Sequence, residues 1–137
     1  MDIKRSAEDF NDCTSKIIGC AMRVHAILGN GFQEVISQRA LEIEMSDERL
    51  NFEREKEMVI FYKTEPIGTH RVDFFVEGEV MVELKAITVL EDVHMAQAIN
   101  YLETYNIKTG LLINFGSKSL TVKRLHNNKY SSNAKLN

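Results

Sequence analysis

The sequence predicts an α/β fold in which a mixed β-sheet is flanked by helices, in the order α-α-β-β-β-α-β-β. Apolar residues recur at helical spacing over the first fifty positions, and a two-residue alternation follows over residues 53–86. One more helical pattern and two apolar strand patterns complete the chain. The 137 residues, 44% of them apolar, suffice for one domain with a real core.

Two helices are predicted at the start of the chain. The first runs from about Ala7 to Leu28, and Gly29, Asn30 and Gly31 end it. The second runs from about Phe32 to Arg49. Its expected buried stripe consists of Phe32, Ile36, Ala40 and Ile43.

The remaining elements are bounded by turn residues. Strands are expected at 53–62, 68–76, 80–86, 110–115 and 120–125, with a helix at 92–105. We assign 1–126 to one domain and 127–137 to a polar, flexible tail.

Charge and apolar runs limit the function classes. A net charge of -3 argues against a protein that coats nucleic acid without sequence preference. No acidic residue follows Glu103, so Lys123 and Arg124 are candidates for binding a phosphate backbone, although a solvated strand edge would give the same pattern. The chain has no apolar run of membrane-spanning length and no secretory signal, so we expect a cytoplasmic protein.

The segment RVDFFVEGEVMVELKA carries the clearest chemical signal. A turn centred on Gly78 sets six apolar side chains toward the core in three cross-strand pairs: Val76 with Val80, Phe74 with Val82, and Val72 with Leu84. The other face receives Arg71, Asp73, Phe75, Met81, Glu83 and Lys85, with Asp73 directly opposite Glu83. Two facing carboxylates disfavour each other, and a divalent cation would relieve the conflict.

Lys85 would lie beside this pair, where its ammonium could orient a water or stabilise charge on a phosphoryl group. The alternative is a set of diagonal salt bridges on a solvated sheet face, which contribute little to stability.

At this point the residues resemble the PD-(D/E)xK nuclease superfamily, here as Asp73 and the triplet Glu83-Leu84-Lys85. The blocks IIGCAMRVHAILGNGFQEVI, VDFFV, VELKA, HMAQAINYL and GLLINFG resemble its GxxExxY branch over roughly Ile17 to Leu125. The final tyrosine of that motif is Ser37 here. The resemblance implies a restriction-endonuclease-like core with an antiparallel three-strand meander.

The resemblance also implies roles for individual residues. Glu34 would complete or support the metal site, giving the metal-binding set Asp73, Glu83, Leu84 and Glu34, and Mg²⁺ or Mn²⁺ would be the cofactor. Gln97 would belong to the catalytic set and Tyr101 to the substrate-binding set. Without the resemblance, Glu34 could merely complement a helix dipole and Gln97 could be an ordinary polar edge. We interpret His25 as a structural, hydrogen-bonded residue.

The leading functional hypothesis is metal-dependent hydrolysis of nucleic acid, most simply DNA. A catalytically silent nucleic-acid- or protein-binding module on the same fold is the alternative. A third interpretation is a structural subunit, and a homodimer is compatible with all three.

Overall fold

The computed structural model describes the backbone of residues 2–132 and the side chains of residues 12–132. Its elements follow the predicted order. They are α1 (Asp2–Leu28), α2 (Glu34–Asp47), β1 (Phe52–Tyr62), β2 (Glu65–Val76), β3 (Val80–Lys85), α3 (Asp92–Thr104), β4 (Thr109–Asn114) and β5 (Thr121–His126).

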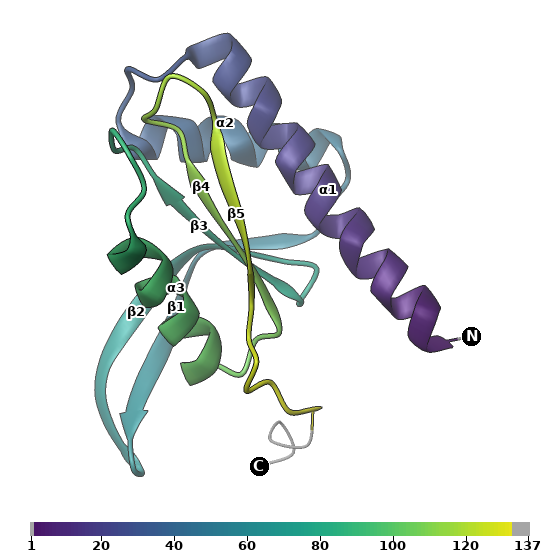
Figure 1. Cartoon of the computed structure of the whole chain (residues 1–137), viewed down its shortest axis with the longest axis vertical. Coiled ribbons are helices and arrows are strands. Elements are labelled where there is room, and N and C mark those ends of the chain that lie inside the picture. Colours follow the sequence, from purple (N-terminus) through teal and green to yellow (C-terminus); the bar gives the residue numbers. More distant parts are fainter. Residues whose placement is uncertain (1, 133–137) are drawn as a thin grey trace.

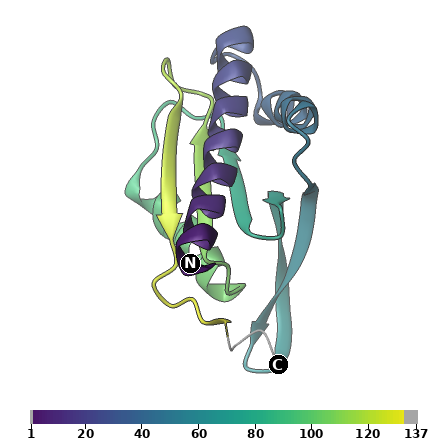
Figure 2. The ribbon, with the colours of Figure 1, turned by 90° about the vertical axis from the view of Figure 1, so that its right-hand side faces the viewer.

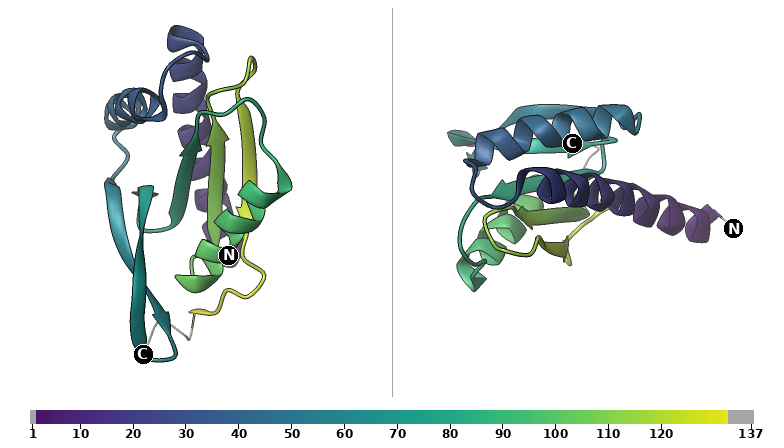
Figure 3. Two further views of the ribbon diagram at one scale, coloured as in Figure 1. Left: turned by 90° about the vertical axis from the view of Figure 1, so that its left-hand side faces the viewer. Right: turned by 90° about the horizontal axis from the view of Figure 1, so that it is seen from above.

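The five strands form one mixed sheet in the order β1-β2-β3-β4-β5. The β3–β4 pair is parallel, because α3 carries the chain back to the starting edge, and the other three pairs are antiparallel. Helices α1 and α2 cover one face (Figure 2) and α3 covers the other (Figure 3, left). The fold class predicted from the sequence is therefore confirmed.

Apolar side chains form one core on each side of the sheet. The α1-side core lies between the sheet and helices α1 and α2, and it contains Ile17, Leu41, Met45, Phe74 and Ile113. The α3-side core is smaller and contains Val72, Met81, Ala98, Leu102 and Leu112. The two cores fix both faces of β3, the strand that carries Glu83 and Lys85.

The first helix buries apolar residues that recur at helical spacing. Ile17 and Ala21 are fully buried and Val24 nearly so. Cys13 and Cys20 are buried free thiols in this stripe.

The buried face predicted for α2 is wrong. Phe32, Ile36 and Ile43 are exposed, and only Ala40 packs against the α1-side core. The buried residues of the helix are instead Ser37, Gln38, Leu41 and Met45. The helix is rotated from the predicted orientation so that Gln38 faces the sheet, where its amide has polar partners.

The β2–β3 hairpin has the predicted turn and register at its closed end. Glu77 and Gly78 both have positive φ, and Val76 pairs with Val80 across them. The ladder continues to Phe74 and Val82 and ends there. The predicted pairs Val72–Leu84 and Asp73–Glu83 do not form.

Val72 also differs from its predicted orientation. It is fully buried, but in the α3-side core, whereas Phe74 lies in the α1-side core. Residues two apart on a regular strand share a face, so β2 changes face at Asp73. Opposite this point Glu55 of β1 has φ +53° and is missing from the β1–β2 ladder. The far part of the β1–β2 hairpin consequently leaves the sheet and projects from the domain (Figure 1).

The segment after β5 begins with a buried, hydrogen-bonded asparagine. Asn127 is 1% exposed, and its amide donates to the Leu102 and Ile107 carbonyls. The predicted tail therefore starts with a residue that fastens β5 to the end of α3, and its residues 133–137 lie outside the described part of the chain. Across residues 2–132, no helix is both long and apolar enough to span a bilayer.

Candidate active site

The site forms where β2 and β3 separate. Beyond the Phe74–Val82 pair, the Leu84 N–H has no main-chain partner on β2, and the side chain of Asp73 accepts its hydrogen bond through Oδ2 at 2.8 Å. The two main-chain polar groups of a strand residue point to the same side, so the Leu84 carbonyl also faces this opening. The Leu84 side chain is buried in the α1-side core, which leaves that carbonyl as its only available metal ligand.

Asp73 is held by a second donor from α2. Gln38 Nε2 donates to Asp73 Oδ1 at 2.8 Å, and Gln38 Oε1 accepts from Arg54 Nη1 at 3.2 Å. Burial raises the pKa of Asp73 from 3.8 to about 6. The hydrogen bond from Leu84 opposes this shift in pKa, and the charge of Glu83 adds to it. The Asp73 carboxylate therefore lies in an environment that disfavours its charge.

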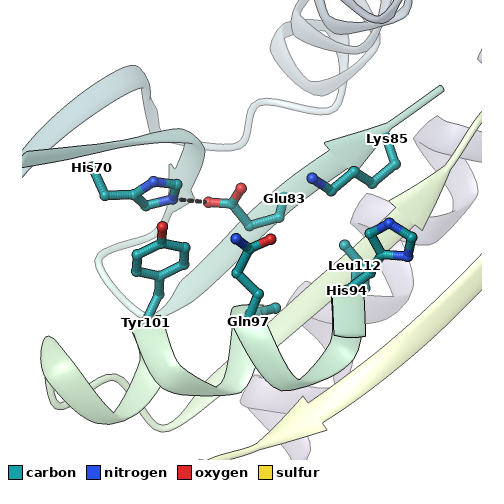
Figure 4. Close-up of a pocket in the computed structure, with 8 residues that line it drawn as sticks. His70, Glu83, Lys85, His94, Gln97, Tyr101 and Leu112 are labelled. Carbon is teal, nitrogen blue, oxygen red and sulfur yellow. Dashed lines mark hydrogen bonds and ion pairs between the residues drawn. The ribbon is translucent and has the colours of Figure 1, made fainter. Parts of the chain in front are cut away.

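Glu83 lies on the α3 side of the opening and lines a cavity of about 180 Å³ (Figure 4). Its Oε1 lies 2.9 Å from His70 Nε2. The cavity is lined by His70, Glu83, Lys85, His94, Gln97, Ala98, Tyr101 and Leu112. Four residues selected from the sequence therefore come together in it, namely Glu83, Lys85, Gln97 and Tyr101.

Asp73 does not line this cavity, but it is coupled electrostatically to the residues that do. The charge of Glu83 raises the pKa of Asp73, which requires the two carboxylates to be near each other. The two carboxylates thus lie within electrostatic reach of each other, Asp73 bonded to Gln38 of α2 and Glu83 in the cavity beside α3, rather than as a cross-strand pair.

Lys85 is positioned by the loop that follows it. Asn114, fully buried, accepts from the Ile87 N–H and donates to the Ile87 carbonyl. Phe115 N donates to the Lys85 carbonyl at 2.8 Å. A Cβ on Gly116 would lie 2.3 Å from the Ile87 nitrogen, so glycine is needed for this close approach. The last residue of β4 and the residues just after it therefore hold the end of β3 in place.

Glu34 is the first residue of α2 and is exposed. Partial burial of its carboxyl raises its pKa, the charge of Lys85 lowers it, and the charge of Glu83 raises it. Glu34 also raises the pKa of Asp73. It therefore stands at the edge of the site, within electrostatic reach of the other charged residues, without lining the cavity.

The two basic candidates on β5 are not part of this arrangement. Arg124 pairs with Leu111 of the α1-side core and its Nη2 donates to Ser15 of α1 at 3.5 Å, so it lies on the opposite face of the sheet. Lys123 pairs with Leu112 and is exposed, but it does not line the cavity. His25 lies 3.0 Å from the Ser117 carbonyl and is a hydrogen-bonded residue, as expected.

Two residues of the site were missed from the sequence. Gln38 lies outside the apolar stripe predicted for the second helix, and His70 precedes the segment from which the hairpin faces were predicted. Gln38 can be recognised as a residue of the site only when the packing of α2 on the sheet is known. His70 can be recognised as a residue of the site only when the change of face of β2 at Asp73 is known.

The donor set suits a hard divalent cation. It offers the carboxylates of Asp73 and Glu83 and the Leu84 carbonyl, with the Glu34 carboxylate nearby. Among the side chains of residues 12–132, no three His, Cys, Asp or Glu groups converge as a ready-made cage. Mg²⁺ does not need one, since it is commonly held by one or two carboxylates and keeps several waters.

The family model for the PD-(D/E)XK nuclease superfamily matches residues 11–125, and the chain belongs to this superfamily. Its members generally use divalent metal ions. No curated protein matches the sequence. A crystal structure of a protein designated SSO0001 superposes with a TM-score of 0.54 at 18% identity, over 75% of this chain. The present chain spans 54% of that protein, so the likeness concerns the fold of one part of it.

Proposed function

We propose that this protein is a Mg²⁺- or Mn²⁺-dependent nuclease that hydrolyses phosphodiester bonds in DNA. The observation that carries the proposal is the opening between β2 and β3, where Asp73 binds the Leu84 N–H within electrostatic reach of Glu83 and Lys85 shares the Glu83 cavity. Membership of the superfamily supports nucleic acid as the substrate. The GxxExxY branch is the subfamily that we propose within it.

In this proposal Asp73, Glu83 and the Leu84 carbonyl bind the ion, and Glu34 supports it from the edge. A bound divalent ion would polarise the phosphoryl oxygen and lower the pKa of an attacking water. Glu83 and Lys85 project into one cavity, so the Lys85 ammonium is placed to hold that water or to neutralise charge developing on the phosphoryl group. Gln97 projects from α3 into the same space, where its amide can orient the water or a phosphate oxygen (Figure 4).

The residues of the substrate path are part of the proposal. Lys123 is exposed on the face of the sheet that α3 covers. Its ammonium can contact the phosphate backbone of a nucleic acid that extends out of the cavity. Tyr101 lines the cavity, where its ring stacks on that of His70. Arg124 faces α1. A nucleic-acid strand bound in the cavity would have to pass around the edge of the β-sheet to contact it.

A silent binding module is the second candidate, and a specific observation favours it. Both oxygens of Asp73 already accept protein hydrogen bonds, and Glu83 contacts His70. A protein that never binds metal could use these contacts simply to close the opening.

A cleavage screen separates the two candidates. Purified protein is incubated with supercoiled DNA, linear DNA and RNA in Mg²⁺, Mn²⁺ or EDTA, beside Lys85→Ala and the control Lys108→Ala, whose lysine is exposed and does not line the cavity. A nuclease cleaves DNA only with metal, loses cleavage in Lys85→Ala and retains it in Lys108→Ala. Binding of DNA without cleavage under every condition would support the silent module and reject the nuclease.

A further inference from the structure

A histidine forms the second bridge across the opening between β2 and β3. His70 Nε2 lies 2.9 Å from Glu83 Oε1, and the two side chains are only 19% and 11% exposed. Both residues lie beyond the last main-chain pair of the two strands. The contact is therefore made by side chains alone, whereas the contact of Asp73 with Leu84 joins a side chain to a main-chain N–H.

The direction of this hydrogen bond follows from the acceptor. An ionised carboxylate carries no proton, so the Nε2–H of His70 donates and Glu83 Oε1 accepts. One oxygen of Glu83 is thereby fixed on the His70 side. The other oxygen, Oε2, has no protein hydrogen bond among the described residues and is available to a ligand.

The imidazole is itself held by an aromatic stack. The His70 and Tyr101 rings are 3.6 Å apart and nearly parallel, at 4°. Tyr101 is followed by Tyr105, at 6.2 Å and 8°, and the Tyr105 hydroxyl donates to the Met58 carbonyl at 3.3 Å. The stack joins α3 to both strands of the projecting hairpin, and it orients the imidazole toward Glu83 (Figure 4).

We propose that His70 is a positioning residue that fixes the rotamer of Glu83, with Tyr101 orienting its ring. This inference rests on the proposed metal-dependent function. It assigns Tyr101 to the support of the site rather than to direct contact with substrate. Groups that orient a metal ligand typically change metal affinity by about 10- to 100-fold when they are removed.

Two substitutions separate the hydrogen bond from the stack. His70→Phe keeps a ring against Tyr101 but loses the donor, whereas His70→Gln keeps an amide donor and loses the ring. His126→Phe on β5 is the matched control, because His126 is exposed and lies outside the cavity. For each variant and the wild type, the measurements are Mn²⁺ affinity from the EPR signal of the free ion, metal-free melting temperature, and the rate of DNA cleavage against Mn²⁺ concentration.

The proposal expects His70→Phe to bind Mn²⁺ about 10- to 100-fold more weakly. Its metal-free protein should remain folded, and its melting temperature should fall only by the modest amount that the loss of one hydrogen bond costs. Its cleavage rate should approach that of the wild type at saturating Mn²⁺, and His70→Gln should recover most of the lost affinity. Wild-type affinity in His70→Phe overturns the positioning role while leaving the proposed function intact. Equal weakening in both variants also overturns it, because a retained hydrogen-bond donor in His70→Gln would then fail to restore the affinity. Absence of Mn²⁺ binding by the wild type overturns this proposal and the proposed function together.

Discussion

Asp73 Oδ2 takes the place of a strand partner for the Leu84 N–H, at 2.8 Å, where the β2–β3 ladder ends. One carboxylate thus bonds the two separating strands and lies within electrostatic reach of Glu83. This double role has a cost, because the hydrogen bonds favour the charged form of Asp73 whereas burial and the neighbouring carboxylates oppose it.

Asp73→Asn should stabilise the metal-free protein above pH 6 and not below pH 4. The folded-state pKa of Asp73 is about 6 and the usual value is 3.8. Below both values the carboxyl is protonated in the folded and unfolded states. Between pH 3.8 and 6 the unfolded state ionises while the folded state stays protonated, so stability falls over this range and the full cost is present above pH 6. The difference corresponds to a cost of about 3 kcal/mol at neutral pH.

Asparagine removes this cost but loses one accepted hydrogen bond, worth about 1 kcal/mol. Urea denaturation of wild type and variant at pH 4 and pH 8 measures the balance. The variant should be the more stable protein at pH 8 and the less stable one at pH 4. Destabilisation of equal size at both values would mean that the Asp73 charge is not disfavoured.

Gly116→Ala should destabilise the fold and disturb Lys85. The new Cβ would meet main-chain atoms of Ala86 and Ile87 at 2.3–2.5 Å, and neither can move without displacing the end of β3. Such a clash typically costs about 1–3 kcal/mol. Gly68→Ala is the control, because nothing lies within 4 Å of a Cβ there. If both variants unfold at the same urea concentration as the wild type, the Gly116 contact does not constrain the loop.

Lys85→Ala should separate hydrolysis from metal binding. Removing a cation aimed at developing charge should lower the cleavage rate by roughly 100-fold or more. Metal affinity should stay the same or rise, because the ammonium lies in the same cavity as the Glu83 carboxylate and repels a cation. Kinetics at saturating Mn²⁺ and a Mn²⁺ binding curve test the two effects. Parallel loss of both would indicate that Lys85 only supports the structure.

Much of the fold follows from patterns that the sequence displays directly. The Gly78 turn and the strands' alternation fix the register from Val76–Val80 to Phe74–Val82, because a one-residue slip would reverse every side chain. The end of the ladder could not be predicted this way. It depends on Glu55, on another strand, whose positive φ coincides with the change of face in β2.

The candidate site was predicted where chemistry and spacing agree, and missed where packing decides. Glu83, Lys85 and Gln97 share a cavity as the motif implies. In α2, two helical stripes compete, and the more apolar one, with Ile36 and Ile43, remains exposed. The other stripe packs Leu41 and Met45 into the core and brings Gln38 to Asp73, a relation that spans 35 positions and leaves no local signal.

The most direct test of the account is the effect of Mg²⁺ on the melting temperature of wild type, Asp73→Asn and Glu83→Gln. If Asp73 and Glu83 bind one ion in the folded state only, a 100-fold excess over the dissociation constant should add about 2.7 kcal/mol to wild-type stability. The shift should vanish in both variants, although Asp73→Asn starts from a higher melting temperature at pH 8. No Mg²⁺ or Mn²⁺ shift in the wild type, together with lower metal-free stability of Asp73→Asn at pH 8, would contradict the account and leave Asp73 as a residue that only closes the sheet.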